Sequence, residues 1–331
     1  MRRDKSLFFK EEKHKKMDQK DYKTVTVVGC GTMGPGITQT FARAGLEVFM
    51  VDLRQEILDQ AMKKIRDQLD LFIELDVISK KDKDPILSRI HPTTGMESAC
   101  RQADYFMEVV PEVLEIKQKV HKQADQWCRP ETIFASNASG ISITAIGTAT
   151  RRPGKVVGTH WVNPPHIMQL VEIVQGDTTT NETVTDVRAF LTRIGKAPIV
   201  CKDTTSYLNN YMQGAIGRAA MELWQKGVAT PEDIDRAVNT GFGFRLPIVG
   251  PLAFFDMAGL DNVRDSWEYT NKVDPGRLGP IALDLLKLVE KGDWGIKTGK
   301  GIYDYSGKDG QEIVKTREKL LILQLKALGR I

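Results

Sequence analysis

A histidine and a glutamate lie twelve residues apart in the stretch GTHWVNPPHIMQLVEIV, residues 158–174. His160 ends one apolar segment, and Glu172 lies inside the next. Histidine suits the base that removes a hydroxyl proton during hydride transfer, because its pKa lies near neutral pH. A carboxylate bonded to the other ring nitrogen would fix the tautomer and stabilise the imidazolium. The pattern therefore predicts a catalytic pair. The alternative is a satisfied core histidine beside an edge-strand glutamate.

The other four histidines are weaker candidates for this base. His14 lies in a charged N-terminal segment, and His91 precedes a proline in a predicted loop. His121 lies in a polar predicted helix, and His166 follows two prolines. Only His160 ends a predicted strand, which is where open α/β sheets gather the residues that face their ligands.

A glycine motif of the form GxGxxG, at Gly29, Gly31 and Gly34, predicts a dinucleotide site. It follows a predicted strand and opens a predicted helix, and Asp52 ends the next predicted strand 23 residues after the first glycine. The glycines permit a tight turn, close approach of a pyrophosphate and close helix packing. The Asp52 carboxylate can accept hydrogen bonds from the adenine ribose and would repel a 2′-phosphate, which favours NAD over NADP. A glycine-rich turn without a ligand is the alternative.

The surrounding elements predict an α/β fold, a Rossmann-type doubly wound sheet followed by an all-α C-terminal domain. Strands are predicted in TVTVVG, LEVFMVD, ADYFMEVVPE, ETIFASNASG, GKVVGTHW and MQLVEIV. Residues 53–90 have a helical period and predict one long helix or a helical pair. The pattern becomes mostly helical near residue 202, and TPEDIDRAVNTG is a well-marked helix that Thr230 caps and Gly241 ends. We expect a NAD-binding domain over residues 21–200 and a helical substrate and dimerisation domain over residues 201–331.

Composition indicates an ordinary globular protein of 331 residues, 41% of them hydrophobic, without the roughly 18–20-residue apolar run that spans a membrane. The first 20 residues carry eight Lys and Arg against four Asp and Glu, and predict a charged, disordered extension. The remaining charges balance at 39 against 39, which argues against a nucleic-acid partner. Four scattered cysteines predict neither disulfides nor a metal site, and favour the reducing cytoplasm.

Several motifs in one order make the chain similar to the 3-hydroxyacyl-CoA dehydrogenase family, from about Thr24 to Tyr305. They are GCGTMGPG, ADYFMEVVPE, SNASGISIT, GTHWVNPP with LVEIV, KDTTSYLNN, GPLAFFDMAGLD and WGIKTGKGIYDY. The resemblance implies NAD as cofactor, a place in fatty acid metabolism, and a homodimer. It also implies that the helical domain closes over the active site.

The resemblance also implies residue roles. His160 would be the general base, Glu172 would orient it, and Ser139 and Asn210 would bind the reacting oxygen of the substrate. The cofactor would meet the glycine loop and positions beyond it: Gly29, Gly31, Thr32, Met33, Gly34, Asp52, Glu112, Lys117, Asn137, Asn163 and Lys297.

Ordinary structural roles remain open for several of these residues. Ser139 can be a hydroxyl that caps a turn, and Asn210 a polar residue on a helix surface. Lys297 can be a loop lysine, and Glu112 with Lys117 an exposed helix pair.

The chain departs from the family at the expected CoA site. Gln68 and Leu75 stand where the family has a serine and a lysine, although Lys63, Lys64 and Arg66 are near enough in sequence to meet a phosphate. These three cations are equally well explained as a solvated helix face.

A second departure lies on both sides of Asn210, in KDTTSYLNNYM, where Thr205-Ser206 replaces Pro-Gly and Tyr211 replaces an arginine. HWVNPPHIMQ, GTMGPG and FFDMAGLD resemble an offshoot of the family that acts on small hydroxy acids or aldehydes without CoA, of the carnitine, gulonate and pyridine-carboxylate types. The substrate is therefore a 3-hydroxyacyl-CoA or a small free acid. A non-catalytic NAD-binding or structural protein is the alternative from another class.

Overall fold

The computed structural model describes residues 20–331, which divide into two compact units. We call residues 20–218 the sheet unit and Ala219–Ile331 the helical unit. The predicted N-terminal extension lies outside the described residues except for Lys20, whose ammonium group binds the carboxylate of Asp186 at 2.8 Å.

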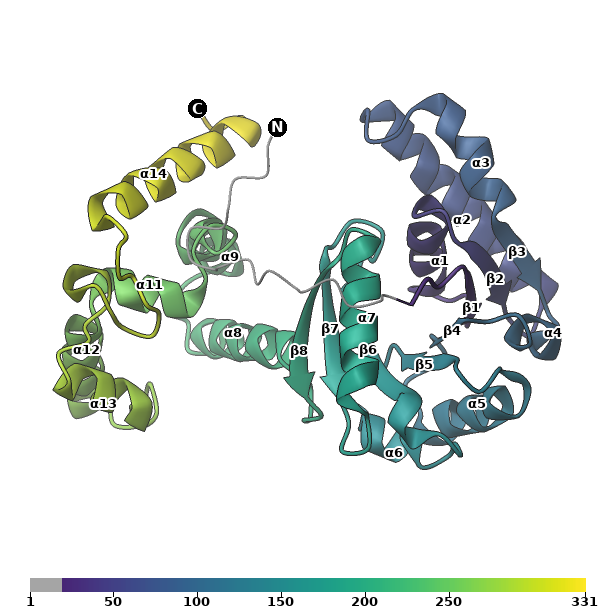
Figure 1. Cartoon of the computed structure of the whole chain (residues 1–331). Coiled ribbons are helices and arrows are strands. Elements are labelled where there is room, and N and C mark those ends of the chain that lie inside the picture. The colour runs from purple at the N-terminus through teal and green to yellow at the C-terminus, as the bar shows by residue number, and fades with distance from the viewer. Residues whose placement is uncertain (1–19) are drawn as a thin grey trace. The chain divides into compact units, whose positions relative to one another are not determined.

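The sheet unit is built on an eight-stranded sheet of order β3-β2-β1-β4-β5-β6-β7-β8 in the described chain (Figure 1). The strands are β1 (Thr24–Val28), β2 (Glu47–Val51), β3 (Ile90–Thr93), β4 (Tyr105–Glu108), β5 (Ile133–Ser136), β6 (Val156–Trp161), β7 (Leu170–Gln175) and β8 (Ala197–Lys202). Neighbouring strands run parallel except β6 and β7, which are antiparallel. The strand order reverses between β1 and β4, which is where doubly wound sheets bind dinucleotides.

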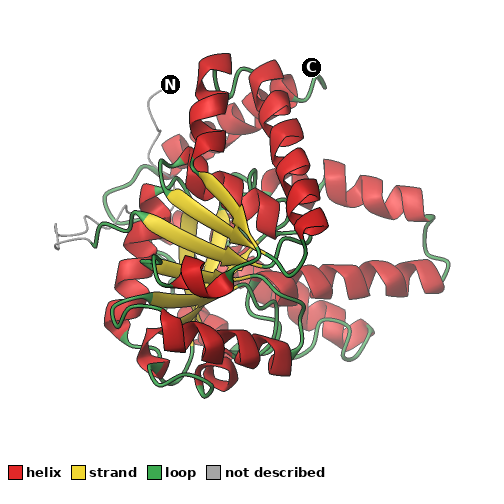
Figure 2. Ribbon diagram, turned by 90° about the vertical axis from the view of Figure 1, so that its right-hand side faces the viewer, coloured by secondary structure: helices red, strands yellow, loops and turns green. Residues whose placement is uncertain are grey.

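Helices cover both faces of this sheet, as Figure 2 shows in red around the yellow strands. The helices of the unit are α1 (Gly34–Arg43), α2 (Gln55–Glu74), α3 (Lys83–Ser88), α4 (Met96–Cys100), α5 (Leu114–Trp127), α6 (Ile143–Gly147) and α7 (Asn181–Arg193). Residues 53–90 therefore form the helical pair, joined by the short 3₁₀ helix η1 (Lys80–Asp82). The architecture confirms the predicted Rossmann-type fold.

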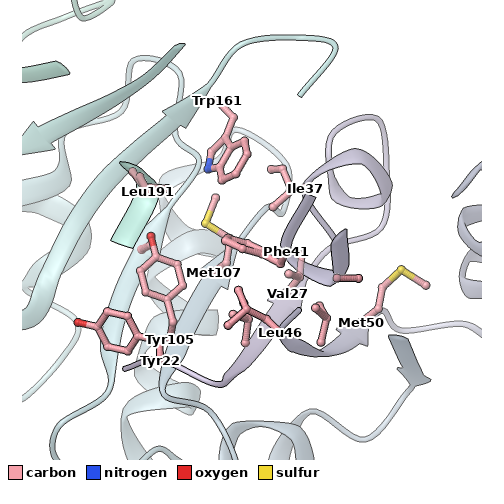
Figure 3. Packing of buried hydrophobic residues seen from close by; sticks show 14 of the residues in the cluster. Tyr22, Val27, Ile37, Phe41, Leu46, Met50, Tyr105, Met107, Trp161 and Leu191 are labelled. Atoms are coloured by element: carbon pink, nitrogen blue, oxygen red, sulfur yellow. The ribbon is translucent and has the colours of Figure 1, made fainter. Parts of the chain in front are cut away.

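Alternate side chains of β4 supply two separate cores. Tyr105 and Met107 belong to one apolar cluster and Phe106 to the other, because successive strand residues point to opposite faces of a sheet. Figure 3 shows the first cluster, in which the fully buried ring of Phe41 lies edge-on to the indole of Trp161, with the ring centroids 5.5 Å apart. Residues buried on both faces explain why these strands are continuous apolar runs in the sequence.

Two strands have no counterpart in the sequence prediction, and both are at the edges of the sheet. β3 contains Pro92 and β8 contains Pro198, and proline interrupts the apolar pattern by which strands are recognised. An edge strand accepts a proline because one side of its backbone needs no partner strand. His91 accordingly lies in β3 rather than in the predicted loop, and its Nε2 contacts the carboxylate of Glu47 at 2.7 Å.

The remaining helices begin with α8 (Asn209–Gln225), which starts in the sheet unit and continues into the helical unit. The others are α9 (Pro231–Thr240), α10 (Phe242–Arg245), α11 (Pro251–Ala258), α12 (Leu260–Val273), α13 (Leu283–Glu290), the 3₁₀ helix η3 (Ile296–Thr298) and α14 (Gly310–Ala327). The cap predicted for α9 is confirmed, since the Thr230 hydroxyl accepts the N–H of Asp233.

A buried carboxylate organises the helical unit. Asp256 accepts hydrogen bonds from the backbone N–H groups of Ile302 and Tyr303, both at 2.9 Å, and from the hydroxyl of Tyr305 at 3.0 Å. A Cβ atom at Gly301 would lie 2.2 Å from the Asp256 carboxylate. The motifs GPLAFFDMAGLD and WGIKTGKGIYDY are therefore the two halves of one packed arrangement.

Candidate active site

His160 and Glu172 face each other across the antiparallel pair of strands β6 and β7. They are direct partners in the ladder, and His160 Nδ1 lies 2.6 Å from Glu172 Oε2. The exposed fractions of the two residues are 5% and 0%. Directly opposite positions bring Cβ atoms to about 5 Å, which is the separation that lets an imidazole and a carboxylate meet. His160 Nε2 has no hydrogen-bond partner among residues 20–331.

The second oxygen of Glu172 is satisfied by backbone at the start of α8. Glu172 Oε1 accepts the N–H groups of Leu208 at 3.0 Å and Asn209 at 2.8 Å. Burial raises the pKa of Glu172, but the hydrogen bonds from His160, Asn209 and Leu208 together hold its pKa below the ordinary value. The carboxylate is therefore charged at neutral pH and fixes the imidazole in one orientation.

The turn that presents these N–H groups has left-handed backbone at two residues that are not glycine. Ser206 has φ of 68° and Tyr207 has φ of 49°. Such conformations cost about 1 kcal/mol or more and are retained where the surroundings enforce them. Tyr207 is buried, its hydroxyl donates to the carbonyl of Ile141 at 2.6 Å, and its ring lies 5.6 Å from the imidazole of His160. The Thr205-Ser206 departure from the family thus still delivers the backbone donors to Glu172.

Ser139 and Asn210 lie next to each other in the sheet unit. The amide nitrogen of Asn210 donates to the backbone carbonyl of Ser139 at 3.2 Å, and the Asn209 amide donates to Asn210 Oδ1 at 3.3 Å. The Ser139 hydroxyl has no hydrogen-bond partner within the described chain, and Ser142 is the residue whose side chain caps α6. The Ser139 hydroxyl is therefore available to a ligand.

The glycine loop has the shape that a dinucleotide requires. Gly29 has φ of 106°, and a Cβ atom there would lie 2.6 Å from the carbonyl oxygen of Val109. A Cβ at Gly34 would lie 2.1 Å from the carbonyl oxygen of Gly29, whereas a Cβ at Gly31 would meet nothing within 4 Å. The space beside Gly31 and the free N–H groups at the start of α1 fit a pyrophosphate.

Other predicted loop residues surround this space. Met33 is the N-cap of α1 without a side-chain cap, and the carbonyl of Thr32 accepts the ammonium of Lys64 at 3.2 Å. Asp52 follows β2, and its two oxygens accept the N–H groups of Cys30 at 2.8 Å and Leu53 at 2.7 Å. A carboxylate oxygen has a second lone pair, so these bonds leave Asp52 able to accept from a ribose.

Lys117 is not part of an exposed helix pair, since its exposed fraction is 1%. Its ammonium group lies 2.8 Å from Glu108 Oε1 and 3.3 Å from Glu112 Oε2. Glu112 in turn accepts the N–H groups of Ser139 at 2.6 Å and Gly140 at 3.1 Å through its other oxygen. A chain of charges therefore links α5 to the loop that carries Ser139.

Glu108 also belongs to this series of linked charges, and it was not predicted from the sequence. It is fully buried at the end of β4, and the Ser136 hydroxyl donates to its Oε2 at 2.6 Å. The available signal was an acid inside the apolar run YFMEVV, which is the same signal that identified Glu172.

The remaining predicted residues occupy different places. Asn137 Oδ1 accepts the N–H of Trp161 at 2.9 Å and so joins the ends of β5 and β6, while Asn163 is exposed after β6. Lys297 belongs to the helical unit, where its ammonium lies 2.6 Å from Asp261. His121 is buried in α5, and its Nδ1 contacts the carbonyl of Lys117 at 2.9 Å.

The predicted CoA positions carry no basic group. Leu75 is 62% exposed at the end of α2, and the buried side-chain oxygen of Gln68 has no hydrogen-bond partner in the described structure. Of the nearby cations, Lys63 pairs with Asp67 at 2.7 Å, and Arg66 has no ion-pair partner among residues 20–331.

Residues 20–331 lack two further features, a metal-binding cluster and a membrane-spanning helix. No group of three or more His, Cys, Asp and Glu side chains there could bind a metal ion. No helix there has both the length and the apolar character needed to cross a membrane.

Comparison with known proteins identifies the relatives of this chain. The family model described as 3-hydroxyacyl-CoA dehydrogenase, NAD binding domain, matches residues 24–204, and the model of the family's C-terminal domain matches residues 207–305. The 5-formyl-3-hydroxy-2-methylpyridine 4-carboxylate 5-dehydrogenase of Mesorhizobium japonicum is 32% identical over 302 residues, 91% of this chain and 96% of that protein. A probable 3-hydroxybutyryl-CoA dehydrogenase of Bacillus subtilis is 34% identical over 289 residues, 87% of this chain and 99% of that protein.

A solved structure of the same family is also similar to this chain. The 3-hydroxyacyl-CoA dehydrogenase of Archaeoglobus fulgidus superposes with a TM-score of 0.78 at 32% identity, over 93% of this chain and 99% of that one.

The two glycines of the loop predict opposite outcomes on substitution. Gly31→Ala should leave stability within about 0.5 kcal/mol of the wild type, because its Cβ meets no protein atom. The same methyl group should weaken NAD binding at least about tenfold, because it enters the space assigned to the pyrophosphate. Gly34→Ala should instead lower the melting temperature, because its Cβ would collide with the Gly29 carbonyl. Calorimetry with and without NAD separates the two effects, and unchanged NAD affinity in Gly31→Ala would contradict the assignment.

Glu172 should make stability depend on acid pH. Its folded pKa is below the unfolded value of about 4.3, so its contribution is complete above that pH and is lost as pH falls through the folded pKa. Glu172→Gln should therefore be less stable than the wild type at pH 7, and the difference should shrink between about pH 5 and pH 3. Urea unfolding midpoints at several pH values measure this, and a difference that grows on acidification would refute it.

Proposed function

The chain belongs to the 3-hydroxyacyl-CoA dehydrogenase family and is an NAD-dependent dehydrogenase, and from this premise we propose that it oxidises a hydroxyl group beta to a thioester or carboxylate. The observation that supports this reaction is the buried pair of His160 and Glu172, with Nδ1 and Oε2 2.6 Å apart and Nε2 unpartnered in the described chain. Such a pair combines a base with the carboxylate that orients it.

In the proposed mechanism, Nε2 of His160 removes the hydroxyl proton of the substrate. Glu172 keeps the proton of the imidazole on Nδ1 and stabilises the imidazolium that forms. The glycine loop and Asp52 would hold NAD, which would supply the acceptor for the hydride that leaves the carbon bearing this hydroxyl. The hydroxyl of Ser139 and the amide of Asn210 would bind the reacting oxygen, so that its developing carbonyl stays aligned with the base. Glu112 and Lys117 would position the Ser139 loop through the charges described above.

The leading substrate is a 3-hydroxyacyl-CoA, which is what several relatives are named for. A small free hydroxy acid or aldehyde acid, of the carnitine, gulonate or pyridine-carboxylate kind, is the second candidate. The observation that favours it is the exposed Leu75, which cannot bind a phosphate at the position where the family has a lysine. A relative named for a pyridine carboxylate supports the same possibility.

We further infer that the chain works as a homodimer in the cytoplasm, within fatty acid metabolism if the thioester is the substrate. The dimer rests on the family resemblance. The location rests on the thiols of Cys30, Cys100, Cys128 and Cys201, all of them free.

Replacing the proposed base tests the mechanism. His160→Gln should reduce turnover about 10²–10⁴-fold while leaving NAD affinity intact, because only the proton acceptor is lost. The control is His91→Gln, a second histidine bonded to a glutamate but lying at the edge of the sheet, and it should retain full activity. Steady-state NADH formation and NAD titration give the two readouts. If His160→Gln retained wild-type turnover, the base would have to be another group.

Measurement of NADH formation distinguishes the two substrate candidates. The compounds to compare are (S)-3-hydroxybutyryl-CoA, free 3-hydroxybutyrate, carnitine, gulonate and a hydroxymethylpyridine carboxylate. We expect the thioester to be oxidised fastest and Arg66→Gln to raise its KM without changing kcat. Lys63 pairs with Asp67 and Lys64 bonds to the Thr32 carbonyl, whereas the Arg66 side chain has no hydrogen bond or ion pair in the described chain. Lys63→Gln, which removes a cation already paired with Asp67, is the matched control. Turnover of a free acid with the thioester ignored would favour the second candidate instead.

A further inference from the structure

A cavity of about 730 Å³ lies in the sheet unit apart from the catalytic pair and the glycine loop. Its walls come from the end of α1, the end of α2, α3, the loop between β6 and β7, and the turn before β8. None of the residues assigned above to catalysis or to NAD lines it. Its volume is in the range of small-molecule sites, which is about 300–1,000 Å³.

Four basic side chains line this cavity: Arg43, Arg89, His166 and Lys196. The guanidinium of Arg43 has no hydrogen bond or ion pair to any residue between 20 and 331, and it stacks over the Phe72 ring, 4.5 Å from the ring centroid. Arg89 donates one N–H to the carbonyl of Pro85 at 3.0 Å. The buried Nδ1 of His166 has no partner in the described structure, and the His166 ring lies 5.7 Å from that of Phe72.

Lys196 is the most buried of the four, with an exposed fraction of 9%. Its ammonium donates to the carbonyls of Pro165 at 2.6 Å and Met168 at 2.8 Å, which fixes the β6–β7 loop against the cavity. These carbonyls are neutral, so the positive charge of Lys196 has no counter-charge in its contacts.

The cations outnumber the acids in the cavity wall. Asp82 is the one acid that lines it among the described residues, and both the N–H and the hydroxyl of Ser79 already bond to its Oδ2, at 2.9 and 2.7 Å. The rest of the wall is largely apolar and includes Phe72, Val77, Ile86, Ile167 and Ile194. The cavity therefore combines unpaired positive charge with a hydrophobic surface.

Burial and, after it, the neighbouring cations lower the pKa values of two of these basic groups. Burial and then the charge of Arg43 lower the pKa of Lys196 to about 8. Burial, followed by the charges of Lys196, Lys64 and Arg43, lowers the pKa of His166. Neighbouring cations depress each other's pKa in this way when no anion lies between them.

We propose that this cavity binds an organic anion, a carboxylate or phosphate head group on an apolar body, with the head group between Arg43, Arg89 and Lys196. The planar guanidinium of Arg43 can bind either head group in a bidentate manner. The apolar body would lie against Phe72 and the isoleucines of the wall. An occupant here would contact the β6–β7 loop that follows His160. The cavity is therefore next to the strand that carries His160 but does not include that residue.

Calorimetric titration of the full chain with octanoate, octyl phosphate and 1-octanol tests this site. We expect at least one of the two anions to bind and the alcohol to bind at least about tenfold more weakly. The head group that binds more tightly identifies the anion as a carboxylate or a phosphate. Equal affinity for the alcohol and both anions would overturn the proposal, because the basic groups would then contribute nothing.

Variants locate the binding. Arg43→Gln and Arg89→Gln should each weaken the anion at least about tenfold, while Lys63→Gln on the exposed face of α2 should not. NAD binding is the control for folding of each variant. The NAD affinity should equal that of the wild type, since neither arginine lies in the glycine loop. If Arg43→Gln and Arg89→Gln bound NAD and the anion like the wild type, the anion would not be in this cavity.

Discussion

The buried charge of Glu172 is the constraint on which the active-site half of this molecule depends. A carboxylate in an apolar strand is stable only if both of its oxygens find donors. One oxygen meets His160 across the β6–β7 ladder, and the other meets the N–H groups of Leu208 and Asn209. The antiparallel pairing of β6 with β7 brings His160 to this group, and the left-handed residues Ser206 and Tyr207 precede the two N–H groups at the start of α8 that complete it.

Two other buried carboxylates are also satisfied by several hydrogen-bond donors. Glu108 at the end of β4 is satisfied by Lys117, Ser136 and a backbone N–H, and Asp256 in α11 is satisfied by two backbone N–H groups and Tyr305. Each buried carboxylate joins segments that are distant in sequence, and each lies inside a motif by which the family is recognised. Removing one partner would leave a buried charge unpaired, which costs several kcal/mol.

Much of the sheet unit could be predicted because its local patterns agree with its fold. The strand, glycine loop, helix and Asp52 follow a period and spacing that few other structures share, and His160 with Glu172 could be inferred from a histidine and an acid in consecutive apolar strands. The edge strands β3 and β8 could not, because Pro92 and Pro198 interrupt the apolar run. His91 was misplaced for the same reason.

The remaining features could not be predicted from the sequence, because they depend on charges that are distant along the chain. Nothing local in the sequence places Lys117 beside Glu108, or brings Arg43, His166 and Lys196 from three separate segments to one cavity. The substrate could not be predicted for a similar reason. Family membership fixes the fold and the NAD-dependent oxidation, whereas the side chains that would meet CoA include positions such as Leu75 at the exposed end of α2. Those positions can change without disturbing the sheet, so one scaffold can serve thioesters in one relative and a pyridine carboxylate in another.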